Sequence, residues 1–219
     1  MILEFDGIQF GFDGKQLLSG VYVKCETGKV TGLLGRNGSG KSTLLKIVFG
    51  AIRTEVLSVR IDGKPIAPPA FRSRQIAYLP QDRFIPSELT LRKILTLYEI
   101  NEDQLLHPFP ELKEDLDLHA DELSGGRLRL FEVLLIVCSR ASFCLLDEPF
   151  TGLTPVFVER LQAVIQQQQR IKGIIITDHL YRQVIRLSDT LYLLSNGKTH
   201  LIQHENDLVQ RGYLVDQVY

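Results

Sequence analysis

Residues 35–42 read Gly-Arg-Asn-Gly-Ser-Gly-Lys-Ser and match the phosphate-binding pattern G-x-x-x-x-G-K-[ST] at every fixed position. The glycines let successive backbone N–H groups turn toward a phosphate chain, and a helix starting beside them adds partial positive charge. In such a loop Lys41 reaches the β- and γ-phosphates, and the Ser42 hydroxyl holds Mg²⁺. The residues expected to contact a nucleoside triphosphate are Gly35, Asn37, Gly38, Ser39, Gly40, Lys41, Ser42 and Thr43.

An acidic pair follows an apolar stretch about a hundred residues after this loop. Asp147 and Glu148 come directly after Phe-Cys-Leu-Leu at 143–146. At the end of a strand, Asp147 can accept Mg²⁺ or its waters, and Glu148 can orient and polarise an attacking water. Such pairs are by themselves usually structural. Together with the phosphate loop, this one predicts hydrolysis of the triphosphate.

Two more polar residues end apolar segments. His179 follows Asp178 after the segment 173–177, and Gln81 follows Pro80 after the segment 76–79. Ligands gather at the carboxyl ends of strands in an open parallel sheet. A lone histidine is more often structural, but a place at the same edge as Asp147 favours a functional role. Gln81 is unremarkable alone.

A second anion site is predicted at 124–126. Ser124, Gly125 and Gly126 come directly before a strongly apolar helix expected from about residue 128 to 138. A serine and two glycines there give an exposed helix N-terminus with close backbone access. One triphosphate does not need two such sites in one chain. We therefore expect the second to serve a nucleotide held by another copy or a partner.

The elements that position these residues follow from apolar periodicity. A helix is expected over 42–49, ending at Gly50, and another over 154–169. Strands are expected at 2–5, 8–12, 17–23, 30–34, 57–61, 76–79, 143–146, 173–177, 191–194 and 199–202. Strands and helices that interleave in this way indicate an α/β core.

Residues 81–123 differ from the rest because charged residues alternate with leucines at helical spacing. They carry 11 acidic and 4 basic side chains, against 15 acidic and 21 basic elsewhere. We expect a helical lobe inserted into the α/β core. The excess of acidic side chains in this segment argues against its binding nucleic acid.

Length and composition limit the class of protein. The 219 residues, 44% of them hydrophobic, suffice for one large core or for a core with a small lobe. Cys25, Cys138 and Cys144 have no paired or metal-like spacing, so we expect reduced core cysteines in a cytosolic protein. No signal peptide is visible, and the apolar run 133–138 is far shorter than the roughly 18 residues that span a bilayer. Any membrane connection is expected to come through a partner.

The order of the motifs resembles the ATP-binding cassette (ABC) family over nearly the whole chain. In sequence order they are the phosphate loop at 35–42, Gln81, LSGGR at 123–127, LLDEP at 145–149, TGL at 151–153 and His179. The resemblance implies one ABC ATPase domain over 1–219. It implies a P-loop NTPase core at 1–80 and 124–219, in which a mixed sheet with flanking helices carries an N-terminal antiparallel β piece. A small helical subdomain occupies 81–123.

The same resemblance implies ATP and Mg²⁺ as cofactors and assigns roles to residues. Glu148, His179 and Lys41 are the catalytic set, with His179 on the γ-phosphate. Ser42, Gln81 and Asp147 belong to the metal site, and Gln81 also senses the transporter. Phe12 lies 29 residues before Lys41. From the sequence alone it either stacks on adenine or covers the sheet, and the resemblance implies stacking.

As a function, the resemblance implies an ATPase subunit that is cytoplasmic and peripheral on the inner face of the membrane. Two such domains, identical or different, would face head to tail around ATP and drive a separate transmembrane subunit. The alternative is a non-transport ABC ATPase that acts on DNA or the ribosome. Those proteins usually carry a tandem cassette or long insertions, and no nucleic-acid partner is expected here. A small-molecule kinase would have no use for LSGGR, DEP and the edge histidine.

Two residues depart from the family pattern. Arg127 stands where glutamine is usual, a variation that the family tolerates. Thr154 stands where the D-loop normally has aspartate, so coupling across the dimer is expected to be weaker or differently wired. The residues of the DEPFTGL and ITDH segments are similar to those of the family branch that contains lipopolysaccharide-export and branched-chain amino-acid ATPases.

Overall fold

A ten-stranded mixed sheet organises the fold, in the strand order β5-β4-β1-β2-β10-β9-β3-β8-β7-β6. The computed structural model describes residues 1–12 and 14–214. The strands are β1 Ile2–Phe12, β2 Lys15–Glu26, β3 Val30–Leu34, β4 Val56–Ile61, β5 Lys64–Pro65, β6 Ile76–Leu79, β7 Phe143–Asp147, β8 Gly173–Thr177, β9 Thr190–Ser195 and β10 Lys198–Ile202. Strands β3, β6, β7, β8 and β9 pair with one another in parallel, whereas β1, β2, β4 and β5 pair with one another antiparallel. Strand β10 joins the two parts, antiparallel to β9 and parallel to β2. The mixed sheet with an N-terminal antiparallel piece is as expected.

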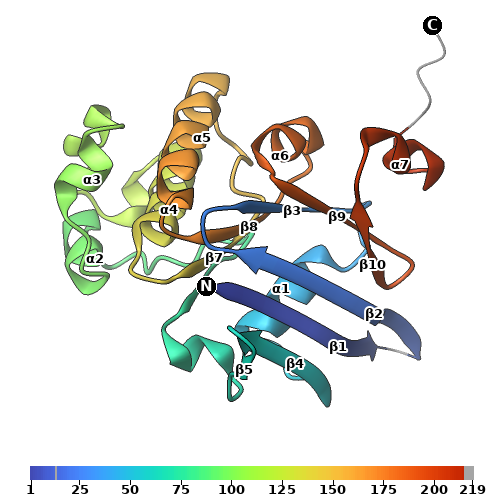
Figure 1. The fold of residues 1–219 in the computed structure, drawn as a ribbon. Helices are drawn as coiled ribbons and strands as arrows, with labels where there is room; N and C mark the ends of the chain where they lie inside the picture. The colour runs from blue at the N-terminus through green and yellow to red at the C-terminus, as the bar shows by residue number, and fades with distance from the viewer. Residues whose placement is uncertain (13, 215–219) are drawn as a thin grey trace, which may run out of the picture.

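The helices flank this sheet. They are α1 Lys41–Phe49, α2 Leu91–Leu97, α3 Glu102–Leu106, α4 Gly125–Cys138, α5 Pro155–Gln169, α6 Tyr181–Leu187 and α7 Glu205–Gln210, with short 3-10 turns η1 Ala70–Ser73, η2 Pro110–Lys113 and η3 Ala120–Glu122. Figure 1 shows α2 and α3, in green, at one end of the molecule beyond α4 and α5. In the described residues, no helix has the length and apolar character needed to cross a bilayer.

Two apolar clusters lie on opposite faces of the parallel strands. One contains Leu44 and Ile47 of α1 together with residues of β1 and β2, so α1 is enclosed between the antiparallel and parallel parts of the sheet (Figure 1). The other joins α4 and α5 to α2 and α3. Neighbouring residues alternate between them: Leu145 belongs to the first cluster and Leu146 to the second. This alternation is the period of two expected of a strand covered on both faces.

Several element boundaries differ from the sequence prediction. Segments 2–5 and 8–12 form one strand, β1, because Gly7 adopts φ 66° and the pairing with β2 shifts register there. An irregularity of this kind bends a strand without ending it. The apolar helix begins at Gly125 rather than near 128, since the Ser124 side chain accepts a bond from the Arg127 N–H and caps it. The two-residue strand β5 was not predicted, because it contains Pro65.

Other boundaries agree closely. The helix after the phosphate loop ends where expected, with Gly50 in a left-handed conformation at its C-terminus. Thr154 caps α5 through its side chain, which accepts from the Phe157 N–H. Segment 81–123 contains α2, α3, η2 and η3, which are short helices separated by turns. Cys25, Cys138 and Cys144 are free and buried, as expected for core cysteines.

The fully buried Leu134 and the 64% exposed Leu97 give a matched test of the packing of α4. We expect L134A to lower the free energy of unfolding by about 2–5 kcal/mol, because the change removes apolar contacts and leaves a cavity. L97A should stay within about 0.5 kcal/mol of the wild type. Urea unfolding of both variants measures the difference. Equal losses of unfolding free energy in the two variants would contradict the burial of Leu134 in the core.

Candidate functional site

The phosphate loop lies between β3 and α1, and its backbone shape depends on glycine. Gly38 and Gly40 adopt left-handed conformations with φ 75° and 102°. A Cβ on Gly35 would come within 2.6 Å of Ser39 Oγ. These positions accept only glycine without strain, and the loop retains the open cradle that a phosphate needs.

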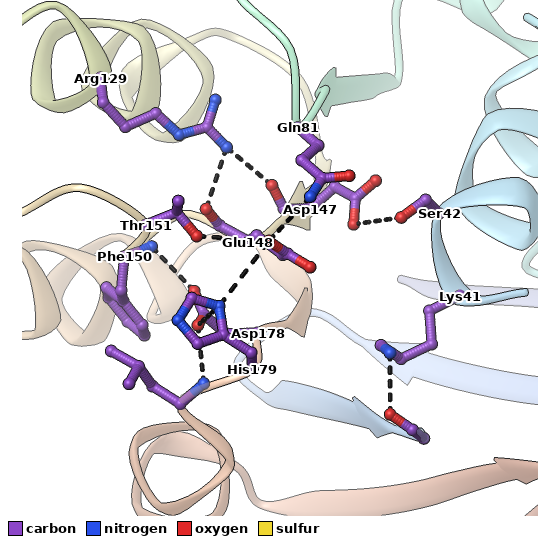
Figure 2. A network of polar contacts seen from close by, with 12 residues as sticks. Lys41, Ser42, Gln81, Arg129, Asp147, Glu148, Phe150, Thr151, Asp178 and His179 are labelled. Atoms are coloured by element: carbon purple, nitrogen blue, oxygen red, sulfur yellow. Dashed lines mark hydrogen bonds and ion pairs between the residues drawn. The ribbon is translucent and has the colours of Figure 1, made fainter. Parts of the chain in front are cut away.

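Lys41, the first residue of α1, extends back across this loop. Its Nζ donates to the carbonyl oxygens of Gly35 at 2.8 Å and of Arg36 at 3.3 Å. Figure 2 shows the Lys41 side chain beside Ser42. Burial lowers the pKa of the Lys41 ammonium, and the nearby Glu148 carboxylate opposes that shift. A partly desolvated ammonium at this place favours an incoming polyphosphate, because attraction between charges strengthens away from water.

Asp147 ends β7 directly opposite the start of α1. Its Oδ1 accepts from the Ser42 hydroxyl at 3.0 Å, and its Oδ2 accepts from Tyr78 OH at 3.1 Å. The carboxylate is fully buried. Burial raises its pKa, while the bonds from Ser42 and Tyr78 lower it.

The donor set of Ser42, Asp147 and Gln81 fits magnesium. All three side chains carry oxygen ligands, and those of Ser42 and Asp147 already lie 3.0 Å apart. Magnesium bound with a nucleotide prefers such oxygens and usually takes one or two protein ligands beside phosphate and water. Within the described ranges, no group of three or more His, Cys, Asp or Glu side chains forms an additional metal cluster.

Glu148 is the meeting point of several elements in Figure 2. Its Oε2 accepts from Gln81 Nε2 at 3.0 Å and from Thr151 Oγ1 at 3.3 Å. His179 Nδ1 lies 3.7 Å from the same oxygen. Glu148 has φ 53°, an uncommon conformation for a residue other than glycine, which costs about 1–3 kcal/mol when a structure enforces it. Such strain is typical of functional sites.

One pocket collects most of the predicted site residues. Its lining is Leu17, Asn37, Gly38, Gly40, Lys41, Ser42, Thr43, Gln81, Glu148 and His179. Asp147 lies just beneath it through its bond to Ser42. Residues from the phosphate loop and from the ends of β6, β7 and β8 therefore face one space. The arrangement can bind a polyphosphate and place a carboxylate next to its end.

Gly35 and Ser39 of the phosphate loop do not line this pocket, and Phe12 and the segment 124–126 also lie outside it. Phe12 ends β1 with its side chain 64% exposed and its ring centroid 6.3 Å from that of Phe10. Ser124, Gly125 and Gly126 lie at the start of α4 and do not line the pocket. A Cβ on Gly126 would come 2.9 Å from the Gly152 carbonyl oxygen. The LSGGR segment at 123–127, the signature, is therefore packed against the TGL turn at 151–153.

The family described as ABC transporter matches residues 18–151, which is more than half of the chain. The chain belongs to the ABC transporter family.

Individual ABC relatives match over most of their length. The lipopolysaccharide export system ATP-binding protein LptB of Haemophilus influenzae is 30% identical, with 99% of this chain and 98% of LptB covered. The branched-chain amino acid transport ATP-binding protein BraG of Pseudomonas aeruginosa is 29% identical, with 93% and 92% covered. A solved ATP-binding subunit of an ABC transporter superposes with a TM-score of 0.84 at 26% identity, covering 97% of this chain and 94% of the other.

These comparisons confirm the family and the fold class expected from the sequence. ATP binding and ATP hydrolysis follow from membership of the ABC family. A role in transport is supported over a role on DNA or the ribosome, since both named relatives serve transport systems. The cue toward the branch of lipopolysaccharide-export and branched-chain amino-acid ATPases agrees with the same names.

One residue beside the candidate site was missed by the sequence prediction. Asp178 is 2% exposed and accepts at 2.9 Å from each of the backbone N–H groups of Phe150 and Leu180. It therefore fixes the turn after Glu148 to the strand end that carries His179. Burial raises the pKa of Asp178, and the two backbone bonds oppose that shift. Its position directly before His179 was the only signal in the sequence.

Burial of Asp147 predicts a pH effect on the stability of the nucleotide-free protein. Because its folded pKa lies above the usual 3.8, the stability it contributes is complete below that pH and is lost as the pH rises through the folded pKa. D147N removes the charge, so its free energy of unfolding should exceed the wild-type value at pH 7. Urea unfolding of both proteins between pH 4 and 7 measures this, and the difference should shrink at low pH. If the difference in free energy of unfolding between D147N and the wild type grew toward low pH, that result would contradict a raised pKa of Asp147.

Proposed function

We propose that this ABC subunit binds ATP with Mg²⁺ at the loop 35–42 and that Glu148 directs water onto the γ-phosphate. The supporting observation is that Lys41, Ser42 and Glu148, from separate elements, line one pocket. Mg²⁺, when bound, neutralises charge on the phosphate oxygens. Ser42, Asp147 and Gln81 would hold it.

The hydrogen bonds of Glu148 fit the role of a base. Gln81 and Thr151 both donate to Oε2, whereas Oε1 accepts no bond from the described residues. In this proposal Oε1 accepts a hydrogen bond from water and aligns it for in-line attack. Lys41 opposes the negative charge that develops on the transferred group, and His179 contacts the γ-phosphate. Phe12, exposed at the end of β1, would stack on the adenine ring.

The second half of the ATP site is proposed to come from a facing ABC domain, on an identical or different chain. Residues 124–126 stand at the N-terminus of the 14-residue helix α4, a position that would favour an anion, and they do not line the pocket of their own chain. A head-to-tail pair would bring the signature of one chain over the phosphate loop of the other. ATP then holds the pair together until it is hydrolysed.

The D-loop position is proposed to modify coupling within this pair. Thr154 caps α5 with its hydroxyl, which accepts from the Phe157 N–H at 3.4 Å. Threonine performs the capping role of the usual aspartate, but it brings no negative charge to the interface. Coupling between the two sites is therefore expected to be weaker than in relatives with aspartate there.

We also propose a division of the chain into two parts and a place of work for the subunit. Residues 81–123 form the helical subdomain, and 1–80 with 124–219 form the nucleotide-binding core. The subunit works at the cytoplasmic face of the membrane with a separate transmembrane subunit, by analogy with relatives named as parts of transport and export systems.

Replacing Glu148 with glutamine tests the proposed base. E148Q should keep ATP binding but lose turnover by about 10²–10⁴-fold, because an amide cannot accept the proton of water. With ATP bound and unhydrolysed, the dimer should accumulate and be seen by size-exclusion chromatography. E159Q, a change at an exposed glutamate on α5, is the matched control and should turn over ATP normally. Wild-type hydrolysis by E148Q would rule out this role.

Mixing two inactive variants tests the head-to-tail pair. K41A lacks a phosphate-loop lysine but keeps its signature, and S124R keeps its phosphate loop but blocks its signature. Neither should hydrolyse ATP alone. After mixing, half of the dimers hold one complete composite site, so about a quarter of the wild-type rate should return. No recovery, although mixed dimers are detected by differently tagged chains, would contradict the composite site.

A further inference from the structure

A buried ion pair lies within the mainly apolar helix α4. Arg129 is 7% exposed and Glu132 is 1% exposed, and Arg129 Nη1 lies 3.4 Å from Glu132 Oε2. Buried charges are rare in proteins unless they are paired and hydrogen-bonded. A well-packed apolar pair could replace such an ion pair with little loss of stability. Their presence in the helix that starts at the signature therefore calls for another role.

Arg129 donates hydrogen bonds to the backbone at the ends of two neighbouring strands, β6 and β7. Its Nη2 donates to the carbonyl oxygens of Asp147 at 2.7 Å and Glu148 at 3.0 Å, as Figure 2 shows. Its Nη1 donates to the carbonyl of Pro80 at 2.8 Å. One guanidinium group thus connects the end of β7 to the residue before Gln81.

The two carbonyl contacts fall where the backbone is unusual. Glu148 has φ 53°, and its N–H donates to the Thr177 carbonyl at 2.7 Å. A residue other than glycine keeps such a conformation only when its surroundings enforce it. Arg129 supplies bonds to the carbonyls on both sides of the Glu148 Cα, and so it helps to fix the direction of the carboxylate.

Glu132 secures the other side of Gln81. Its Oε1 accepts from the backbone N–H of Phe84 at 3.0 Å. Together the two side chains hold Pro80 and Phe84, which bracket Gln81, and Gln81 donates to Glu148. Hydrogen bonds from α4 therefore hold both the backbone of Glu148 and the segment that carries Gln81, its side-chain partner.

We propose that the Arg129–Glu132 pair positions Glu148 and Gln81 for hydrolysis and couples the signature helix to them. Neither residue lines the pocket that contains Lys41 and Glu148. The inference rests on the proposed role of Glu148 as the base.

Substitution of Arg129 tests the positioning role. R129M should lower kcat roughly tenfold to a hundredfold, since a misplaced catalytic group slows the reaction by this order. The KM for ATP should change less than about twofold, because the phosphate loop is untouched. R129K retains the charge opposite Glu132 and can still donate to a carbonyl, so its kcat should fall between those of R129M and the wild type. Thermal unfolding of each variant reports its folded fraction.

Arg160 supplies the matched control. It is also a partly buried arginine, and it pairs with Glu111 at 2.7 Å and lies 4.4 Å over the Phe109 ring, away from Glu148. R160M should keep the wild-type kcat. If R129M and R129K also keep it, the inference is overturned. It is equally overturned if the activity of R129M falls only in proportion to its folded fraction. Should R129M not fold, R129K decides by the same criteria.

A double variant separates this inference from the proposed function. If Arg129 acts through Glu148, single-turnover hydrolysis by R129M/E148Q should equal that of E148Q alone. A further drop by the factor seen in R129M would show that Arg129 acts independently of Glu148 and would overturn the inference. Wild-type turnover by E148Q would instead overturn the role of Glu148 itself, and that result does not depend on R129M.

Discussion

Parallel pairing of β3, β8 and β7 places three distant segments of the chain at one edge of the sheet. Val30 pairs with Ile174, and Asp147 pairs with Thr177, so the phosphate loop, the acidic pair and His179 all leave the sheet at the same level. A slip of one residue in β7 would turn Asp147 to the other face of the sheet and away from Ser42. The apolar clusters on both faces prevent that slip, because Leu145 and Leu146 each fit only one of them.

This edge gathers like charges in a place with little water. Asp147 and Asp178 are buried, Glu148 is adjacent to both, and burial raises the pKa of each aspartate. The fold tolerates the arrangement because every one of these carboxylates accepts hydrogen bonds. Stability is lost at such a site in exchange for groups already directed at a substrate.

Much of this arrangement was predictable, for reasons that differ between residues. The phosphate loop and the acidic pair follow from local sequence, since their spacing and flanking apolar runs determine both shape and place. The contacts of Arg129 depend on how α4 packs against the ends of β6 and β7, which no local pattern records. Its only trace is an arginine and a glutamate three residues apart in an apolar helix. The boundaries of β1 were wrong because Gly7 signals a break in sequence but forms only an irregularity in the sheet.

The bonds from Lys41 to the carbonyls of Gly35 and Arg36 have a consequence for the kinetics of nucleotide capture. The ammonium crosses its own loop and fixes the backbone of Gly35 and Arg36. Binding then requires an exchange of carbonyl partners for phosphate oxygens, and little chain entropy is lost on association. A loop that is preorganised in this way favours rapid capture of a polyphosphate.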